Sequence, residues 1–336
     1  MSNTASAIQT REKSMIRKEL TVRFNTPAFL GNAEQSGQWR TPPFKHLLRE
    51  WWRVAWAEKN PPSKWRHMRE MEGKLFGHAW LENDVDRKGK KTASRKSNVI
   101  LRLDSWRDGT LNALPRTRPA AQGAPVSALY LGYGPVKNAQ SLNMAHPIDE
   151  GKQATLRIAY PSELPGAELM ERTVALIDSY GTVGGRSRNG WGSVTFDGAS
   201  LDAVNPPLRD WTQCLREEWA HAIGEDERAL IWTTRQSHRQ WQHVIEELAA
   251  IRKGVNSLCR GWERAVLNQP VGGKGDRVPS NLRFKIRRDA NGEFYGVIFH
   301  MPFSPPSSPS SSTLQQVWQG VHQFLDGNNT IQRSPK

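Results

Sequence analysis

Apolar and polar positions follow a regular succession of strand and helix patterns over the first 200 residues. Alternation, as in Leu20, Val22 and Phe24, predicts a half-buried strand, whereas recurrence every three or four positions predicts an amphipathic helix. The patterns predict a strand at 20–24, helices after 42–43 and at 63–80, strands at 99–103 and 154–158, a helix at 169–180 and a strand at 191–196. This is the order of a ferredoxin-like unit, an antiparallel sheet with helices on one face, which also underlies RNA-recognition motifs.

The pattern changes after Asn-Pro-Pro at 205–207. It then predicts helices at 208–222 and 241–262, a hairpin of strands at 282–286 and 294–301, a Pro/Ser-rich linker at 303–313 and a last helix at 314–325. We therefore expect an α+β chain whose second half consists of helices and a reduced sheet. The predicted boundaries are a disordered segment at 1–14, a first domain at 15–204, a helical insertion with a second domain at 205–302, the linker at 303–313, and a C-terminal helix and tail at 314–336.

The helix that follows the two prolines at 42–43 carries a second stripe besides its apolar face. Lys45, Arg49, Trp52 and Trp56 recur at the spacing of successive helical turns, with Arg53 beside them. A single-stranded nucleic acid requires cations that follow its phosphates and aromatic rings that stack on its bases, at roughly 1–3 kcal/mol per base. The alternative interpretation is that Trp52 and Trp56 are buried in a subunit interface while the cations are solvated.

Residues 181–193, GTVGGRSRNGWGS, combine five glycines with two arginines. Glycine lets a backbone approach a ligand closely, and Arg186 and Arg188 add forked donors that match phosphate geometry. The segment follows a helix and opens a strand, whereas a dinucleotide-binding loop follows a strand and opens a helix. The sequence thus predicts an anion-binding loop whose ligand is a nucleic-acid backbone. The alternative is a helix C-cap and tight turn with solvated arginines.

The charge balance favours an acidic partner. Among 336 residues, 47 Lys and Arg against 33 Asp and Glu give a formal net charge of +14. Basic clefts gain free energy by releasing the counterions around phosphates. No apolar run is long enough to span a bilayer and no helix pairs a lysine-rich face with a purely apolar one, so we expect no membrane partner. Cys214 and Cys259 supply neither a disulfide framework nor a zinc set, which predicts a cytoplasmic protein.

No pattern in the sequence predicts a catalytic, metal or cofactor site. The candidate general acids and bases, His46, His67, His78 and His146, stand without a second catalytic group that the sequence identifies. The GGKG segment at 272–275 lacks the frame of a nucleotide-binding loop, and no cluster of Asp, Glu and His has metal-ligand spacing. We therefore expect a protein that is not an enzyme and holds no cofactor.

Five stretches in this order resemble the RAMP proteins of CRISPR systems, in particular the family of the first RAMP subunit of the Cmr, or type III-B, effector complex. They are TPAFLGN, RTPPFKHLLREWWR, LYLGYG, GTVGGRSRNGWGSV and SNLRFKI…GEFYGVIFHMP, within residues 20–302. The early family motif is matched by Arg40, Pro42, Pro43, Arg49, Trp51, Trp52 and Arg53. His46 departs from the family, which usually has a glycine after the lysine.

The resemblance implies two ferredoxin-like (RRM-like) folds in tandem, the second reduced and decorated with helices. It also implies a non-catalytic subunit at the head of the complex near the crRNA 3′ side, beside another RAMP subunit and small subunits, which helps to hold crRNA, target RNA or both. Together with the patterns above it predicts RNA contacts by Arg40, Lys45, Arg49, Trp52, Arg53, Gly184, Gly185, Arg186, Arg188, Asn189 and Gly190. The alternatives are a RAMP-type endoribonuclease that processes crRNA and a scaffold that contacts only proteins.

Overall fold

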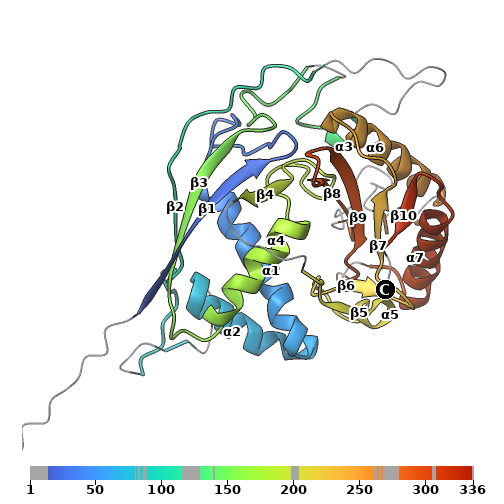
Figure 1. Ribbon diagram of the computed structural model, residues 1–336. Helices are drawn as coiled ribbons and strands as arrows, with labels where there is room; N and C mark the ends of the chain where they lie inside the picture. The colour runs from blue at the N-terminus through green and yellow to red at the C-terminus, as the bar shows by residue number, and fades with distance from the viewer. Residues whose placement is uncertain are drawn as a thin grey trace, which may run out of the picture.

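The computed structural model describes residues 14–79, 81, 84–85, 89–115, 129–138, 141–197, 204–260, 263–264, 266–267, 280–304 and 308–334. Two four-stranded sheets stand next to each other, each with its own helices (Figure 1). The predictions that fall wholly or partly outside the described residues include the disordered segment at 1–14, the GGKG segment at 272–275 and the linker at 303–313, of which residues 1–13, 272–275 and 305–307 are not described. In the described part of the chain, no helix is both long enough and apolar enough to cross a membrane.

The first sheet has the strand order β2-β3-β1-β4, and all its strand pairs are antiparallel. Its strands are β1 (Met15–Phe24), β2 (Ile100–Leu103), β3 (Gln153–Pro161) and β4 (Val194–Asp197). Its helices are α1 (Thr41–Lys59), α2 (Trp65–Phe76) and α4 (Met170–Tyr180), with single 3-10 turns η1 (Pro62–Lys64) and η2 (Ala167–Leu169) before the last two. The predicted succession of elements is confirmed, and its strand order is that of a ferredoxin-like unit.

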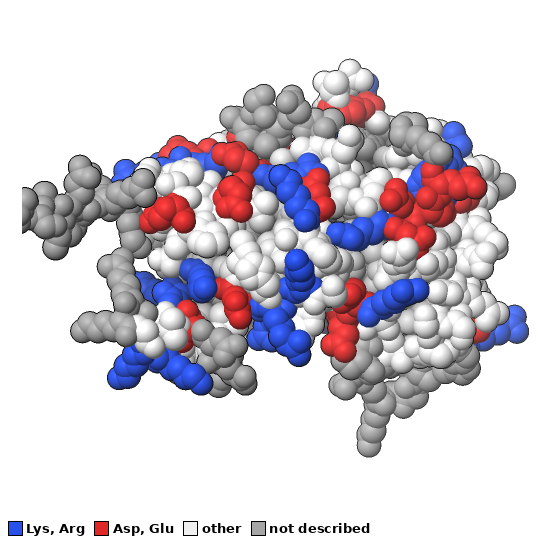
Figure 2. Space-filling model, turned by 90° about the horizontal axis from the view of Figure 1, so that it is seen from below, with Lys and Arg blue, Asp and Glu red and all other residues white. Residues whose placement is uncertain are grey.

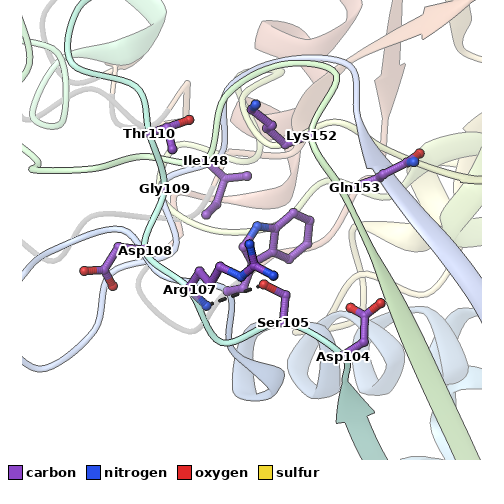
Figure 3. A pocket seen from close by; sticks show the side chains of 10 residues that line it. Asp104, Ser105, Arg107, Asp108, Gly109, Thr110, Ile148, Lys152 and Gln153 are labelled. Carbon is purple, nitrogen blue, oxygen red and sulfur yellow. Dashed lines mark hydrogen bonds between the residues drawn. The ribbon is translucent and has the colours of Figure 1, made fainter.

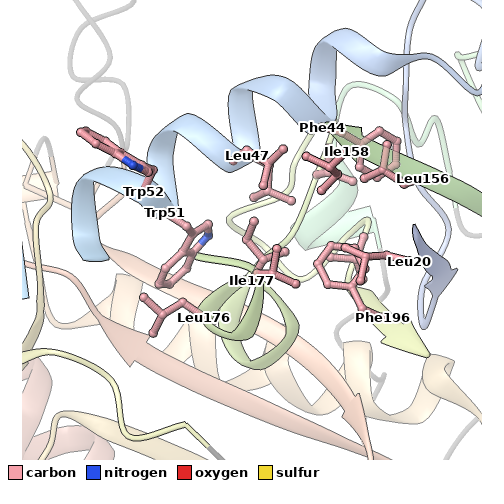
Figure 4. Close-up of a cluster of buried hydrophobic side chains, with 14 of the residues drawn as sticks. Leu20, Phe44, Leu47, Trp51, Trp52, Leu156, Ile158, Leu176, Ile177 and Phe196 are labelled. Atoms are coloured by element: carbon pink, nitrogen blue, oxygen red, sulfur yellow. The ribbon is translucent and has the colours of Figure 1, made fainter. Parts of the chain in front are cut away.

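The core of this half lies between the sheet and helices α1 and α4 (Figure 4). Leu20, Leu156 and Phe196 extend from the strands toward Leu47 of α1 and Ile177 of α4, and none of these five side chains is more than 5% exposed. Alternate residues of a strand share one face, which is why the apolar positions of the sequence pattern meet in one layer.

The second sheet has the same arrangement, with the order β10-β7-β9-β8 and antiparallel pairs throughout. Its strands are β7 (Ile231–Thr234), β8 (Leu282–Arg288), β9 (Phe294–His300) and β10 (Ile331–Arg333). Helices α6 (Trp241–Ser257) and α7 (Ser311–Asp326) belong to it. The predicted hairpin is confirmed as β8 and β9. Unlike the expected reduced sheet with a separate C-terminal helix, the sheet is completed by β10, which pairs with β7, and α7 contributes Trp318 to the same core.

The helix predicted at 208–222 is wrong. The chain instead forms β5 (Leu208–Asp210), one turn of helix α5 (Trp211–Cys214) and β6 (Ile223–Glu225), with β5 and β6 parallel. The side chain of Asp210 accepts hydrogen bonds from the backbone N–H groups of Thr212 and Gln213, and so caps a helix that ends after one turn. Arg209 donates to two carbonyl oxygens at the end of α1, which holds this segment against the first unit.

A buried lysine joins the two units. Lys285 of β8 is fully buried, and its Nζ donates to three backbone carbonyl oxygens around the end of α4 and the start of β4. The acceptors are those of Ile177 at 2.9 Å, Asp178 at 2.6 Å and Val194 at 2.8 Å. The negative end of the α4 dipole also stabilises a positive charge at this place. The glycine-rich loop between α4 and β4 is therefore held in place by both units.

The second unit contains two buried histidines that lie in contact with each other. His322 Nε2 lies 3.0 Å from His300 Nδ1, and the His300 ring stacks on Trp318 with centroids 4.1 Å apart. Burial lowers the pKa of His300 well below its usual range, and burial followed by the nearby Arg333 lowers the pKa of His322 to about 3. The folded protein therefore holds both rings neutral, whereas the unfolded chain protonates them below about pH 6.5.

We expect the free energy of unfolding to fall as the pH is lowered from 6.5 to 5. The unfolded chain binds more protons in this range, and His322 alone accounts for about 2 kcal/mol at pH 5. Urea unfolding at several pH values measures this effect. H322Q should reduce the pH dependence, while H67Q, at an exposed histidine, should leave it unchanged. Equal pH dependence in wild type and H322Q would contradict the assignment.

Candidate nucleic-acid interface

A groove runs between the first half of α1, the glycine-rich loop and strand β8. Its wider part encloses about 630 Å³ and continues into a second part of about 280 Å³. Both parts are lined by His46 and Glu50 of α1, Arg188 of the loop and Arg283 of β8. The groove therefore lies where the two units meet.

Three cations of α1, Lys45, Arg49 and Arg53, line the wider part, as their four-residue spacing predicts. The side chain of Glu72 in α2 is 3% exposed and binds two of them. Its Oε1 accepts from Arg49 Nε at 2.9 Å and from Arg53 Nη2 at 2.8 Å. Burial and the neighbouring Arg49 lower the pKa of Lys45. One carboxylate thus orients two guanidinium groups, and the three cations together retain an excess of positive charge.

The glycine-rich loop forms the opposite wall with Gly184 and Arg188. Gly184 has a φ of +93°, and a Cβ at this position would lie 2.7 Å from the carbonyl oxygen of Phe29, so the close packing of the loop requires glycine. The Arg188 backbone is fixed because its carbonyl oxygen accepts from Phe284 N of β8 at 2.9 Å. Burial, and then repulsion by Arg283, lowers the pKa of Arg188 to about 10, which leaves it charged at neutral pH. A bound anion would stabilise this guanidinium.

Arg283 of β8 supplies a fifth cation, which was not among the residues predicted from the sequence. Its Nη1 lies 2.7 Å from Glu50 Oε1, and its side chain is 7% exposed. Burial acts to raise the pKa of Glu50, but Arg283 and Arg188 outweigh it, so the pKa is lowered and the carboxylate stays charged. The available signal was the alternation of Arg283 and Lys285 with apolar residues in one strand. Both faces of β8 are buried, so the alternation alone does not say which cation faces a cleft.

Trp52, predicted to stack on RNA bases, belongs to the core instead. Its side chain is fully buried, Nε1 donates to Gly166 O at 2.8 Å, and its ring meets Phe76 edge-to-face at 6.1 Å between centroids. Trp56 is 1% exposed. Both interpretations of these residues, base stacking and a subunit interface, are contradicted. The physical reason is that α1 packs against α2 and α4 as well as the sheet, so more than one of its faces is covered.

Two other predicted residues at the edges of the motifs lie outside the groove lining. Arg40 precedes α1, and its Nη1 donates to the carbonyl oxygen of Gly31. Gly185 N donates to the carbonyl oxygen of Phe29 at 2.9 Å, which ties the loop to the chain after β1. These contacts position the two walls rather than face the groove.

The remaining loop residues also point elsewhere. Asn189 Nδ2 donates to the carbonyl oxygen of Leu131 at 2.9 Å. Gly190 has a φ of +87° and packs next to Ile245 of the second unit. Arg186 has a φ of +56°, and its guanidinium lies against Gly134. Of the predicted loop residues, the structure thus brings Gly184 and Arg188 to the groove.

The charge of the groove suits a polyanion. On the face drawn in Figure 2, Lys and Arg side chains gather between the two lobes, with acidic side chains beside them. Among the described residues that line the wider part, one carboxylate, Glu50, faces five cations. The cations are Lys45, Arg49, Arg53, Arg188 and Arg283.

A separate hollow of about 330 Å³ lies along residues 104–110, against Trp39 and Ile148 (Figure 3). Here the backbone N of Arg107 donates to Ser105 Oγ at 3.5 Å. Asp104 and Asp108 accompany Arg107 and Lys152 in its lining, so opposite charges balance. This hollow is therefore less suited to a phosphate chain than the groove is.

The candidate catalytic histidines do not come together. Of the four, His46 lines the groove, while His78 Nε2 lies 2.7 Å from Asp84 Oδ2 in the loop after α2. His67 lies next to Trp56, and His146 has a φ of +52° in a turn. Within the described ranges, no three His, Cys, Asp or Glu side chains are grouped so that they could hold a metal ion.

Several solved chains are similar to this one, among them the following three. Apo Cmr1 from Pyrococcus furiosus has 14% sequence identity and a TM-score of 0.51, with 95% of this chain and 98% of that chain covered. A chain of the type III-B Cmr-beta complex bound to cognate target RNA and AMPPnP, in the presence of ssDNA, has 12% identity and a TM-score of 0.45, with 94% and 100% covered. A chain of Cmr-beta bound to cognate target RNA has 11% identity and a TM-score of 0.44, with 91% and 99% covered. The first of these carries the conclusion that the fold is shared.

The sequence itself gives the family. No curated protein matches the chain. The sequence model of the RAMP superfamily matches residues 22–195, slightly more than half of the chain. This region spans β1 to β4, including α1 and the glycine-rich loop that line the groove. The chain belongs to the RAMP superfamily.

Proposed function

We propose that this chain is a non-catalytic, RNA-binding subunit of a type III-B CRISPR effector complex, and that its groove holds crRNA, target RNA or both. The observation that carries the proposal is the convergence of five cations from three separate elements on one groove, namely Lys45, Arg49, Arg53, Arg188 and Arg283. Two carboxylates accompany them, Glu50 in the described lining and Glu72, which pairs with Arg49 and Arg53. Five cations on opposite walls match the spaced charges of a phosphate chain. Membership of the RAMP superfamily and the fold shared with Cmr1 support the choice of complex.

In this proposal the subunit stands at the head of the complex near the crRNA 3′ side, next to other RAMP and small subunits. Lys285 joins the two units beside the groove through its hydrogen bonds to the ends of the loop-bearing segment. Binding of RNA then positions the strand, and no bond is cleaved by this chain.

The test is the affinity of the full chain for a fluorescent single-stranded RNA at several salt concentrations. If the groove contacts Z phosphates, a plot of the logarithm of the association constant against log [salt] has a slope near −0.7Z. We therefore expect a slope of about −2 to −3.5 for three to five contacts. A slope near zero, or no binding at low salt, contradicts the proposal.

The second candidate is a crRNA-processing endoribonuclease, and the place of His46 in the groove favours it. Incubation of the chain with CRISPR-repeat RNA in the absence of metal distinguishes the two. Our proposal predicts intact RNA. Specific cleavage that is lost in H46A would instead support the ribonuclease.

A further inference from the structure

An exposed tyrosine stands beside the glycine-rich loop, outside the groove. Tyr133 follows the short helix α3 (Leu129–Gly132) and is 70% exposed, more than any other large apolar or aromatic side chain of the described residues. Tyr130, on the same helix, is 39% exposed, and its hydroxyl accepts a hydrogen bond from Asn256 Nδ2 at 2.6 Å. Of these two rings, Tyr133 is the one that the fold presents to solvent.

The turn that carries Tyr133 is fixed to the loop. Asn189 Nδ2 donates to Leu131 O at 2.9 Å, two residues before the tyrosine. On the other side, Asn143 Nδ2 donates to Gly134 O at 2.7 Å, immediately after it. The ring is therefore held by a backbone that is anchored on both sides, which lowers the conformational entropy lost when a ligand stacks on it.

Arg186 lies directly beside this turn. Its Nη2 is 3.3 Å from the position that a Cβ would occupy on Gly134, the residue after Tyr133. Arg186 also has a φ of +56°, a conformation that a non-glycine residue adopts at a cost on the order of 1 kcal/mol. The two arginines of the loop have different surroundings. Arg188 lines the groove, and Arg186 lies next to the tyrosine.

The surroundings of Tyr133 indicate which class of partner it contacts. Among residues 134–138, which follow it in the chain, the exposed ones are Gly134, Lys137 and Asn138, and none of them has an apolar side chain. A protein interface buries its aromatic residues within a desolvated apolar centre. An exposed ring beside a guanidinium group is instead what a single-stranded nucleic acid uses, because the ring stacks on a base while the cation holds a phosphate.

On the basis of the proposed function, we infer that Tyr133 stacks on a base of the RNA strand that leaves the groove over the glycine-rich loop, and that Arg186 binds the neighbouring phosphate. This extends the RNA path from α1 and β8 across residues 184–188 to the turn after α3. Tyr133 supplies the stacking surface that the buried Trp52 does not.

The experiment measures the affinity of the full chain for a fluorescent single-stranded RNA, in wild type, Y133A and Y133F. We expect Y133A to bind about 5- to 150-fold more weakly, as for the loss of one base–aromatic stack, with an unchanged salt slope. Y133F should bind like wild type because it keeps the ring. W106A, at a 56% exposed ring in the segment after β2, serves as the matched control and should not change the affinity. Abasic RNA should bind to wild type and Y133A equally.

Failure of this inference and failure of the proposed function give different results. If wild type binds RNA with the expected salt slope but Y133A binds equally well, the inference is overturned. The groove is then still assigned to RNA, and Tyr133 is assigned to a contact with another protein. If Y133F is as weak as Y133A, the hydroxyl group rather than stacking is responsible, which also overturns it. If wild type shows no salt-dependent binding, the proposed function fails and the inference fails with it.

Discussion

Replacing Trp52 by alanine is expected to lower the free energy of unfolding by about 3–5 kcal/mol, the range for removing a fully buried large aromatic side chain. The indole is enclosed by this chain alone and leaves a cavity when it is removed. The substitution also leaves the carbonyl oxygen of Gly166 without its donor. A Cβ added to Gly166 would lie 2.4 Å from Trp52 Cζ2, which is too close. Gly166 and Trp52 are therefore closely packed.

Urea unfolding followed by tryptophan fluorescence or circular dichroism measures this loss. W52F keeps most of the volume but not the N–H donor and should be intermediate, while W106A should change the stability by no more than about 0.5 kcal/mol. At temperatures where W52A is folded, its affinity for RNA should equal that of wild type. A stable W52A that binds RNA poorly would show that the indole faces the nucleic acid, against the burial described above.

Reversing the charge of Arg188 is expected to reduce the affinity for single-stranded RNA roughly 10- to 100-fold, the effect of one lost charge-assisted hydrogen bond to a phosphate. Arg188 belongs to both parts of the groove and lies near the ion pair of Glu50 and Arg283. In R188E the new carboxylate also repels the phosphates. The slope of log association constant against log [salt] should become less negative by about 0.7, because one phosphate contact is lost.

R239E is the matched control, since it makes the same change of net charge at a side chain that is 92% exposed and outside the groove lining. Fluorescence anisotropy at three salt concentrations measures both variants, and thermal unfolding confirms that each is folded. Equal losses in R188E and R239E would show that the affinity depends on net charge alone, and would contradict a defined site at the groove.

The sequence predicted the first unit well because its elements are long and strongly patterned. Alternation in β1 and β3 and the three-four spacing in α1 and α4 place their apolar residues in one core. β10 was not predicted because a strand of three residues is too short to show an alternation of apolar and polar positions. The apolar spacing at 208–222 predicted a helix, but residues 208–210 form β5, which pairs with β6, and the helix that Asp210 caps ends after one turn.

The candidate site was predicted in part. Lys45, Arg49 and Arg53 could be placed together because helical spacing fixes which residues are neighbours. The meeting of this stripe with Arg188 follows from tertiary packing, and Arg283 joins them from a strand more than 200 positions away from α1. The burial of Trp52 depends on α2 and η2 covering a second face of α1, which no local pattern records.

The open face of the first sheet is the other basic surface that an RNA strand could contact. RNA-recognition motifs bind bases on this face through aromatic side chains. Here the exposed outward residues of β1, β2 and β3 are Met15, Arg17, Glu19, Ile100, Arg102, Gln153 and Arg157, without an aromatic ring. Arg157 is paired with Glu19 at 2.7 Å, which reduces its availability to a phosphate. The groove is therefore the stronger candidate of the two.

Photo-crosslinking of the full chain to single-stranded RNA that contains 4-thiouridine, with the attached peptides identified by mass spectrometry, compares these two surfaces directly. We predict crosslinks within residues 41–53 of α1 and residues 182–188 of the glycine-rich loop, which line the groove. Crosslinks confined to the open sheet face, at residues 15–19, 100–102 and 153–157, would contradict the account.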